Sequence, residues 1–187
     1  MKRLAALLVT FAIILCGCAS GEHNMDRAMA LRARLLQSKG CQFTAVIAAD
    51  YGKTLYSFEL DCEADDKGAV RFKVTQPQSI AGVTGRIDGE GGKLTFDDQA
   101  VAFPLLADDQ FSPVSAPWIL LKTLRGGYMT ACGHQGDALV ITVDDRYEED
   151  ALQLDIFLDG EDLPRGADIY WKGERCLSLE VKNFRIL

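Results

Sequence analysis

The chain has 187 residues, with 20 basic side chains against 27 acidic ones and a formal net charge of −7. An acidic balance of this size disfavours nucleic acid and bare anionic lipid surfaces as partners. Hydrophobic residues make up 48% of the chain, and a chain of this length can bury a substantial core in one domain.

The first residues predict a secretory signal. Lys2 and Arg3 form a basic start, and an apolar run follows from Leu4 to Leu15. A basic start followed by a short apolar stretch and small residues is typical of exported proteins. The run is too short to cross a bilayer, which requires about 20 apolar residues.

The segment after this run resembles a bacterial lipobox. In that motif an aliphatic residue stands three positions before the lipidated cysteine, and a small residue stands directly before it. Cys18 fits, with Leu15 and Gly17 in those places. Cys16 fits less well because the bulky Leu15 precedes it. The alternative is an ordinary signal peptide that happens to contain two cysteines.

We therefore expect a signal peptide over residues 1–17, a lipidated tether over residues 18–23 and one water-soluble domain over residues 24–187. Two or more acyl chains on Cys18, palmitate among them, would hold the protein on the extracytoplasmic side of the cell membrane, because one chain anchors only marginally. Cleavage before Cys18 would remove Lys2 and Arg3, which leaves 18 basic and 27 acidic residues and a net charge of −9.

Residues 24–38 predict the first helix. Asn24 or Asp26 can cap its start, and Lys39-Gly40 is a typical end. The apolar residues at helical spacing are Met25, Ala28, Leu31 and Leu35. The arginines that lie off this stripe, which we expect to form a solvated face, are Arg27, Arg32 and Arg34.

Beyond Gly40 the hydrophobic period changes to two, which predicts a hairpin of strands 41–48 and 55–62. A turn centred on Tyr51-Gly52 sorts nearly all apolar side chains to one face, and a slip of one residue would destroy that sorting. The same register places Cys41 directly opposite Cys62, a position that can carry a disulfide.

The cysteines after the lipobox are interpreted as two disulfides. Export places them where disulfides are permitted. The hairpin register pairs Cys41 with Cys62, which leaves Cys132 to pair with Cys176. Free buried thiols are the alternative. Zinc is disfavoured because close Cys-x-x-Cys pairs are absent.

More strands follow, and a helix interrupts them. Alternation predicts a strand over 70–74 that Pro77 ends, a glycine-containing strand over 79–87, and strands beginning near Leu94 and Val101. Pro113 to Pro117 breaks the series, and a helix capped by Ser115 or Ala116 follows. This helix is apolar nearly all round, which is typical of buried helices. The last strands are predicted near 128–132, 138–144, 152–158, 166–172 and 175–186.

These elements predict an α+β fold with a single curled antiparallel sheet of about nine to ten strands, forming an incomplete barrel. The N-terminal helix and the inserted apolar helix would lie on its concave side. A single sheet of this size tends to curl. Two short helices cover only part of an apolar face, so the sheet either closes over a packed core or leaves an apolar cavity.

Two stretches carry a family resemblance, namely Val74-Thr75-Gln76-Pro77 followed by Ile80-Ala81-Gly82, and the segment from Leu163 to Arg175. Both resemble the LolA/LolB-like lipoprotein-carrier superfamily. The resemblance covers residues 24–187. It implies an incomplete barrel whose helices act as a lid, and a non-enzymatic role in binding or carrying a lipid, a lipidated protein or a similar amphiphile.

A hydrophobic ligand would contact the inner face of the sheet and the inserted helix. The residues expected to line this site are Phe43, Phe58, Phe72, Phe96, Phe103, Trp118, Leu121 and Leu124. Such cavities are mostly apolar and have few polar anchors. Plain core packing is the alternative explanation of the helix residues.

No pattern of catalytic residues stands out. The two histidines are His23, in the tether, and His134, in a predicted turn, and no serine has the Gly-x-Ser-x-Gly setting of a nucleophile. Adjacent acidic residues on strands point to opposite faces, and Asp144 to Asp150 lacks the glycine of a calcium loop. We therefore expect no enzyme, no cofactor and no metal. The expected state is a monomeric binding protein, with a cell-envelope sensor or protein-interaction lipoprotein with a packed barrel as the alternative.

Overall fold

The computed structural model describes residues 19–50, 55–96, 99–104, 106–107, 110–148 and 150–187. Cys18 and the signal segment lie outside the described residues, so their lipidation and cleavage remain predictions. Over the described ranges no helix is both long and apolar enough to cross a membrane.

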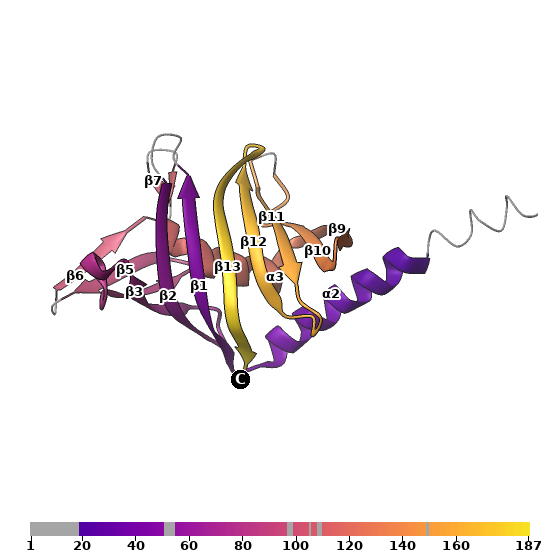
Figure 1. Cartoon of the computed structure of the whole chain (residues 1–187), viewed down its shortest axis with the longest axis horizontal. Coiled ribbons are helices and arrows are strands. Elements are labelled where there is room, and N and C mark those ends of the chain that lie inside the picture. Colours follow the sequence, from indigo (N-terminus) through magenta and orange to yellow (C-terminus); the bar gives the residue numbers. More distant parts are fainter. Residues whose placement is uncertain (1–18, 51–54, 97–98, 105, 108–109, 149) are drawn as a thin grey trace, which may run out of the picture.

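One antiparallel sheet of eleven strands dominates the structure (Figure 1). Its order is β6-β5-β4-β3-β2-β1-β13-β12-β11-β10-β9, so the C-terminal strand pairs with the first strand. The strands of one half are β1 (Gly40–Asp50), β2 (Leu55–Asp65), β3 (Val70–Gln76), β4 (Thr84–Asp88), β5 (Gly91–Phe96) and β6 (Gln99–Phe103). Those of the other half are β9 (Tyr128–Gln135), β10 (Ala138–Asp144), β11 (Leu152–Leu158), β12 (Pro164–Trp171) and β13 (Glu174–Ile186).

The sheet curls but does not close, because β6 and β9 form its two edges. The predicted single curled antiparallel sheet is confirmed, with eleven strands in place of nine to ten. The smaller elements are η1 (Gln78–Ile80), the hairpin of β7 (Leu106–Ala107) and β8 (Gln110–Phe111), and η2 (Pro113–Ser115). The strand predicted over 79–87 is wrong in its first half: η1 and a turn at Gly82, with φ of 92°, occupy it.

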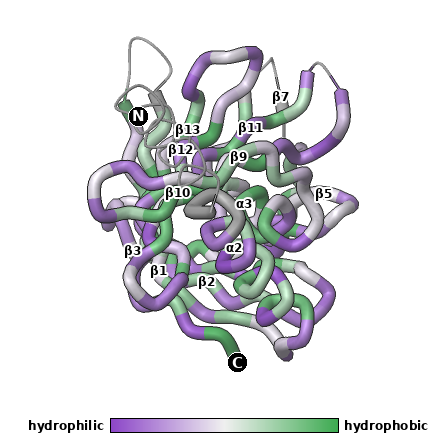
Figure 2. Tube along the Cα trace, turned by 90° about the vertical axis from the view of Figure 1, so that its right-hand side faces the viewer, coloured by the Kyte–Doolittle hydropathy of each residue, from purple (hydrophilic) through white to green (hydrophobic). Residues whose placement is uncertain are grey.

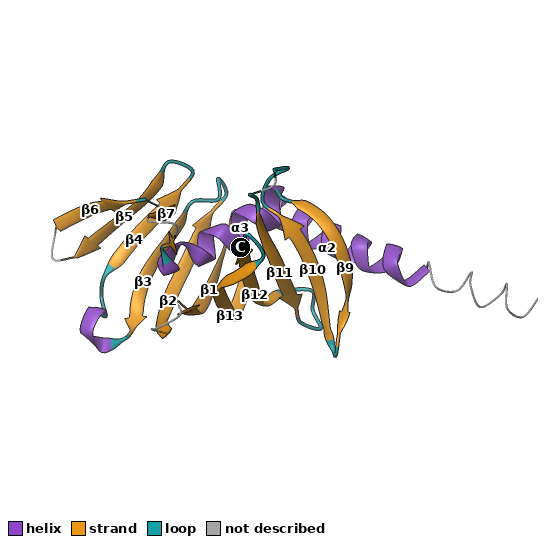
Figure 3. Ribbon diagram, turned by 90° about the horizontal axis from the view of Figure 1, so that it is seen from above, coloured by secondary structure: helices purple, strands orange, loops and turns teal. Residues whose placement is uncertain are grey.

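In the part of the chain that the structure describes, two α-helices accompany the sheet, α2 (Ala19–Gln37) and α3 (Ala116–Gly126). Seen from above, α3 lies inside the curve of the sheet, and α2 runs beside the edge strand β9 (Figure 3). Hydrophobic segments gather around α3, whereas many outer loops are hydrophilic (Figure 2). The predicted buried helix is confirmed, since most side chains of α3 are buried. The predicted N-caps of the first helix are wrong, because Asn24 and Asp26 lie within α2.

The hairpin of β1 and β2 has a register two residues away from the predicted one. Phe43 faces Cys62 and Cys41 faces Ala64. A shift of two residues keeps every side chain on the same face, so the predicted sorting survives: Cys41, Phe43, Ala45 and Ile47 are all buried.

The four described cysteines are free thiols, so neither predicted disulfide is seen in the structure. Cys41 and Cys62 share a face of neighbouring strands but lie diagonally, not opposite one another. Cys132 lies on β9 and Cys176 on β13, and three strands separate them in the sheet. Neighbouring strands lie about 4.8 Å apart, which puts that pair beyond the reach of a disulfide.

Thiol reactivity should separate these cysteines. Burial raises the pKa of Cys41 to about 12 and also raises the pKa of Cys62. At pH 8 both thiols are therefore almost entirely protonated, and the thiolate is the reactive form. We expect iodoacetamide to modify the partly exposed Cys132 well before Cys41 and Cys62, as measured by peptide mass spectrometry. In denaturant all of them should react at similar rates. Equal rates in the folded protein, or a disulfide-linked peptide pair, would contradict the structure.

The two helices are joined by reciprocal arginine contacts. Arg32 of α2 donates from Nε to the carbonyl oxygen of Leu124 at 2.7 Å and from Nη2 to that of Gly127 at 2.7 Å. Arg125 of α3 donates from Nη1 to the carbonyl oxygen of Leu35 at 3.3 Å. Each guanidinium thus meets the C-terminal end of the other helix, where a cation is favourable. The predicted solvated face is therefore wrong for Arg32, whose burial lowers its pKa.

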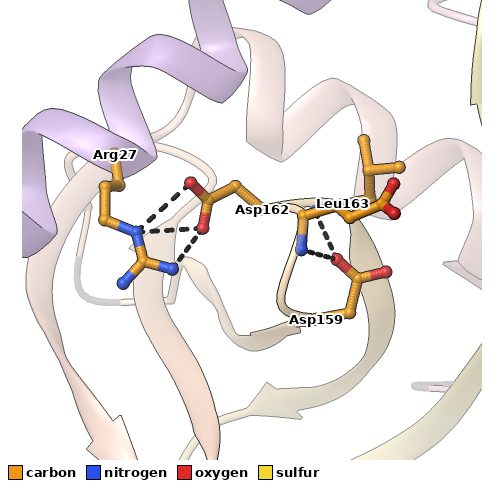
Figure 4. Close-up of polar contacts among 5 residues, drawn as sticks. Arg27, Asp159, Asp162 and Leu163 are labelled. Carbon is orange, nitrogen blue, oxygen red and sulfur yellow. Dashed lines mark hydrogen bonds and ion pairs between the residues drawn. The ribbon is translucent and has the colours of Figure 1, made fainter.

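Arg27 ties α2 to the turn between β11 and β12 (Figure 4). Its Nε donates to both carboxylate oxygens of Asp162, at 3.0 and 3.2 Å, and this hydrogen bonding raises the pKa of Arg27. Asp159 holds the turn by accepting the backbone N–H of Leu163 at 3.0 Å. Arg27 therefore also departs from the predicted solvated face, whereas Arg34 is exposed as expected.

Candidate functional site

An apolar row crosses the inner face of the sheet from β1 to the edge strand β6. Residues directly opposite one another on paired strands point to the same face, so the pairing register defines the row. Its members are Phe43, Cys62, Phe72, Gly85, Leu94 and Val101. Phe96 and Phe103 lie on the same face, two residues along from Leu94 and Val101.

Burial along this row falls toward the edge of the sheet. Phe43 and Phe72 belong to the core, whereas Val101 is 63% exposed and Phe96 is 59% exposed. The inserted helix α3 packs against β10, β11 and β13, at the opposite side of the sheet from β6. We call the paired strands β5 and β6 the β5–β6 wing. The inner face of this wing is the least covered part of the apolar surface.

Two glycines, Gly85 on β4 and Gly92 within the wing, let aromatic rings lie against the backbone. A Cβ on Gly85 would come within 2.3 Å of Cζ of Phe72, and one on Gly92 within 2.2 Å of Cζ of Phe103. Both rings therefore lie over a neighbouring strand at a place where no side chain stands. The sequence predicted a bend, a bulge or a close backbone approach for the glycine-containing strand, and Gly85 provides a close approach.

The eight residues predicted to contact a ligand fall into three groups. Phe43, Phe72, Trp118, Leu121 and Leu124 are buried in one core cluster. Phe58 and Phe103 are partly buried and pack against that cluster. Phe96 stands apart on the wing. Seven of the eight therefore meet in or beside the core, and Phe96 is mostly exposed.

The sequence prediction missed two members of this surface, Leu94 and Val101. Both were assigned to strands, and their alternation with Phe96 and Phe103 placed them on one face. Their position beside Phe72 and Gly85 depends on the pairing of β3, β4 and β5. Tyr56, whose ring lies 6.4 Å from that of Phe58, extends the apolar surface along β2 and was also missed.

The inner face offers shape and apolar area but few titrating groups. The thiols of Cys41 and Cys62 are buried there, and burial raises their pKa values. His134 lies exposed on β9, far along the sheet from the wing. Within the described ranges, no three His, Cys, Asp or Glu side chains are grouped so that they could hold a metal ion. Such a surface can bind a hydrophobic ligand by burial of area.

Comparisons with known proteins find similarity in fold. No protein-family model and no curated protein matches the sequence. Among solved structures, an uncharacterized conserved protein of Thermus thermophilus is 13% identical, with a TM-score of 0.47 and coverage of 89% of this chain and 86% of that one. A LolA superfamily protein of Nitrosomonas europaea is 8% identical, with a TM-score of 0.44 and coverage of 86% and 93%. An outer-membrane lipoprotein-sorting protein domain of Vibrio parahaemolyticus is 11% identical, with a TM-score of 0.46 and coverage of 88% and 92%.

Solved structures similar to this chain thus include a LolA superfamily protein and a lipoprotein-sorting protein domain. The likeness concerns the course of the chain.

Proposed function

We propose that this protein binds a hydrophobic ligand on the inner face of its sheet, without catalysis and without a cofactor. The ligand would be the acyl chain of a lipid, of a lipidated protein or of a similar amphiphile. The protein would act as a monomer, held on the extracytoplasmic side of the cell membrane by lipid on Cys18. The observation that carries the proposal is the apolar row that runs from the core out to Val101, whose side chain is 63% exposed.

The β5–β6 wing would be the point of entry. An acyl chain lying over Val101, Phe96 and Leu94 would bury methylene groups, each worth about 0.8 kcal/mol. Phe58, Phe103 and the deeper Phe43 and Phe72 lie on the same face. Contact with Trp118, Leu121 and Leu124 would require α3 to move, as in the lid arrangement that the resemblance implies.

A second candidate function is that of a cell-envelope sensor or protein-interaction lipoprotein. The dense packing of α3 favours it, since a core that is already filled leaves less room for a ligand. The edge strand β6 is mostly exposed along its length, and an exposed edge can accept a strand from a partner protein.

Titration with dansyl-labelled undecanoic acid would test the ligand proposal. We expect a saturable rise in fluorescence with the unaltered protein. The double variant Phe96→Ser/Val101→Ser should bind the probe at least about tenfold more weakly, because burying one such side chain is worth about 1.5–3 kcal/mol and 1.4 kcal/mol is a factor of ten.

The matched control is Met29→Ser/Leu36→Ser on α2, where both side chains are also about half exposed. It should bind the probe as the unaltered protein does. A ligand-free mass spectrum of gently purified protein together with no probe binding would overturn the proposal. Equal weakening in both double variants would show that the wing is not the site.

A further inference from the structure

A hollow of about 680 Å³ opens on the outer face of the sheet, on the side away from α3. It extends over β13, β1, β2, β3, β4 and β5. Most of its wall is formed by polar side chains that alternate along these strands with the buried inner residues. Phe43, Cys62, Phe72 and Gly85 of the apolar row also border it. Its basic members are Arg71, Lys73, Arg86, Lys93 and Arg185.

The charge of this hollow is opposite in sign to that of the chain. Five basic side chains line it against two acidic ones, Asp61 and Glu63, although the whole chain has a net charge of −7. If basic side chains were distributed at random over an acidic protein, five of them would not be expected in one hollow. A concave surface lined by one sign of charge concentrates ions of the other sign.

Three of these cations stand directly opposite one another on neighbouring strands. Arg71 pairs with Arg86, and Arg86 pairs with Lys93. Like charges in directly opposite positions destabilise a sheet, so this row has a cost that folding alone does not explain. A ligand of opposite charge would offset it.

Acidic neighbours neutralise this row only in part. Arg86 has two loose ion pairs, with Asp65 at 3.8 Å and Asp88 at 3.5 Å. Among the described residues, neither Arg71 nor Lys93 has a carboxylate within the 4.0 Å of an ion pair, even though Glu63 faces Arg71 across β2 and β3. The cationic groups therefore remain available to a ligand.

We infer that this hollow binds an anion that carries two or more phosphoryl groups. Guanidinium groups match phosphate oxygens with two parallel hydrogen bonds, and a lysine adds a point charge. Cations on three successive strands span about 10 Å at a strand spacing of about 4.8 Å, which is wider than one phosphate requires. The volume also lies in the range of small-molecule sites, about 300–1,000 Å³. Thr84, Thr95 and Gln42 supply further polar groups in its wall.

Calorimetric titration with inorganic pyrophosphate tests this inference, and co-sedimentation with vesicles of phosphatidylglycerol distinguishes a lipid source from a free phosphorylated compound. We expect pyrophosphate to bind, more weakly as salt screens the charges. The triple variant Arg71→Gln/Arg86→Gln/Lys93→Gln should lose at least about tenfold in affinity, because charge-assisted hydrogen bonds are the strong ones. Its thermal stability should be unchanged or higher, since the repulsion between opposite cations is removed.

The control is Arg34→Gln/Lys39→Gln/Lys67→Gln, which removes the same charge from exposed positions outside the hollow. It should bind pyrophosphate within about twofold of the unaltered protein. The protein could bind vesicles of phosphatidylglycerol but not of phosphatidylcholine, with this binding lost in the first triple variant alone. That result would support a lipid head group as the source. Binding of pyrophosphate alone would support a free compound. No binding in either arm, or equal losses in both triple variants, would overturn the inference. The fatty-acid test alters Phe96 and Val101, which do not line this hollow, so failure of one proposal is distinguishable from failure of the other.

Discussion

Leu124→Ala should lower the free energy of unfolding by about 2–5 kcal/mol, measured by urea denaturation. Leu124 is fully buried in α3 and belongs to the core cluster. Truncation removes buried methyl groups and leaves a cavity that a packed sheet and two bound helices cannot readily fill. Arg32 also bonds the carbonyl oxygen of Leu124, which holds the backbone in place around the cavity.

Leu36→Ala is the matched control, because Leu36 is a helical leucine with about half of its surface exposed. Its effect should stay within about 0.5 kcal/mol. Fatty-acid binding by Leu124→Ala, measured well below its midpoint of unfolding, distinguishes two arrangements. Unchanged affinity would place the ligand on the β5–β6 wing, whereas a clear loss would mean that α3 itself contacts the ligand. A loss of stability below 1 kcal/mol would show that the core around α3 is looser than the structure indicates.

Gly40→Ala should destabilise the protein by about 2–6 kcal/mol, from backbone strain and overpacking together. Gly40 has a φ of 144°, which L-residues rarely adopt, and a Cβ would lie 2.0 Å from the carbonyl oxygen of Ala64. This residue starts β1 where the chain enters the sheet from α2. Its carbonyl oxygen also accepts the backbone N–H of Leu187 at 2.9 Å, so strain there reaches the strands on both sides.

Gly133→Ala on β9 is the control, because a Cβ there meets nothing within 4 Å and φ is not in the left-handed region. That change should be neutral or stabilising by up to about 1 kcal/mol, since alanine restricts the unfolded chain more than glycine does. Thermal or urea unfolding of the two variants side by side is the measurement. Similar stabilities of the two variants would refute the close approach at Gly40.

Local patterns determined much of this fold. Period-two alternation predicted most strands within a few residues, because a half-buried strand must place apolar side chains on every second position. The all-round apolar character of residues 118–125 predicted a buried helix, since such a surface has no stable solvent-exposed face. The same alternation assigned Phe43, Phe58, Phe72, Phe96 and Phe103 to one face of the sheet.

Tertiary structure decided what depends on partners distant in the chain. The hairpin register differs by two residues from the predicted one, a shift that side-chain sorting cannot detect because it preserves the face. Because of that shift, Cys41 and Cys62 do not stand directly opposite one another. The strand order separates Cys132 on β9 from Cys176 on β13. The sequence predicted a solvated face for Arg32, whereas in the fold its guanidinium donates to the carbonyl oxygen of Leu124 near the end of α3. The cationic hollow is likewise invisible in an acidic sequence, because Arg71, Arg86 and Lys93 meet only through pairing across three strands. Periodicity reports which face a residue occupies, whereas its neighbours on that face are set by long-range contacts.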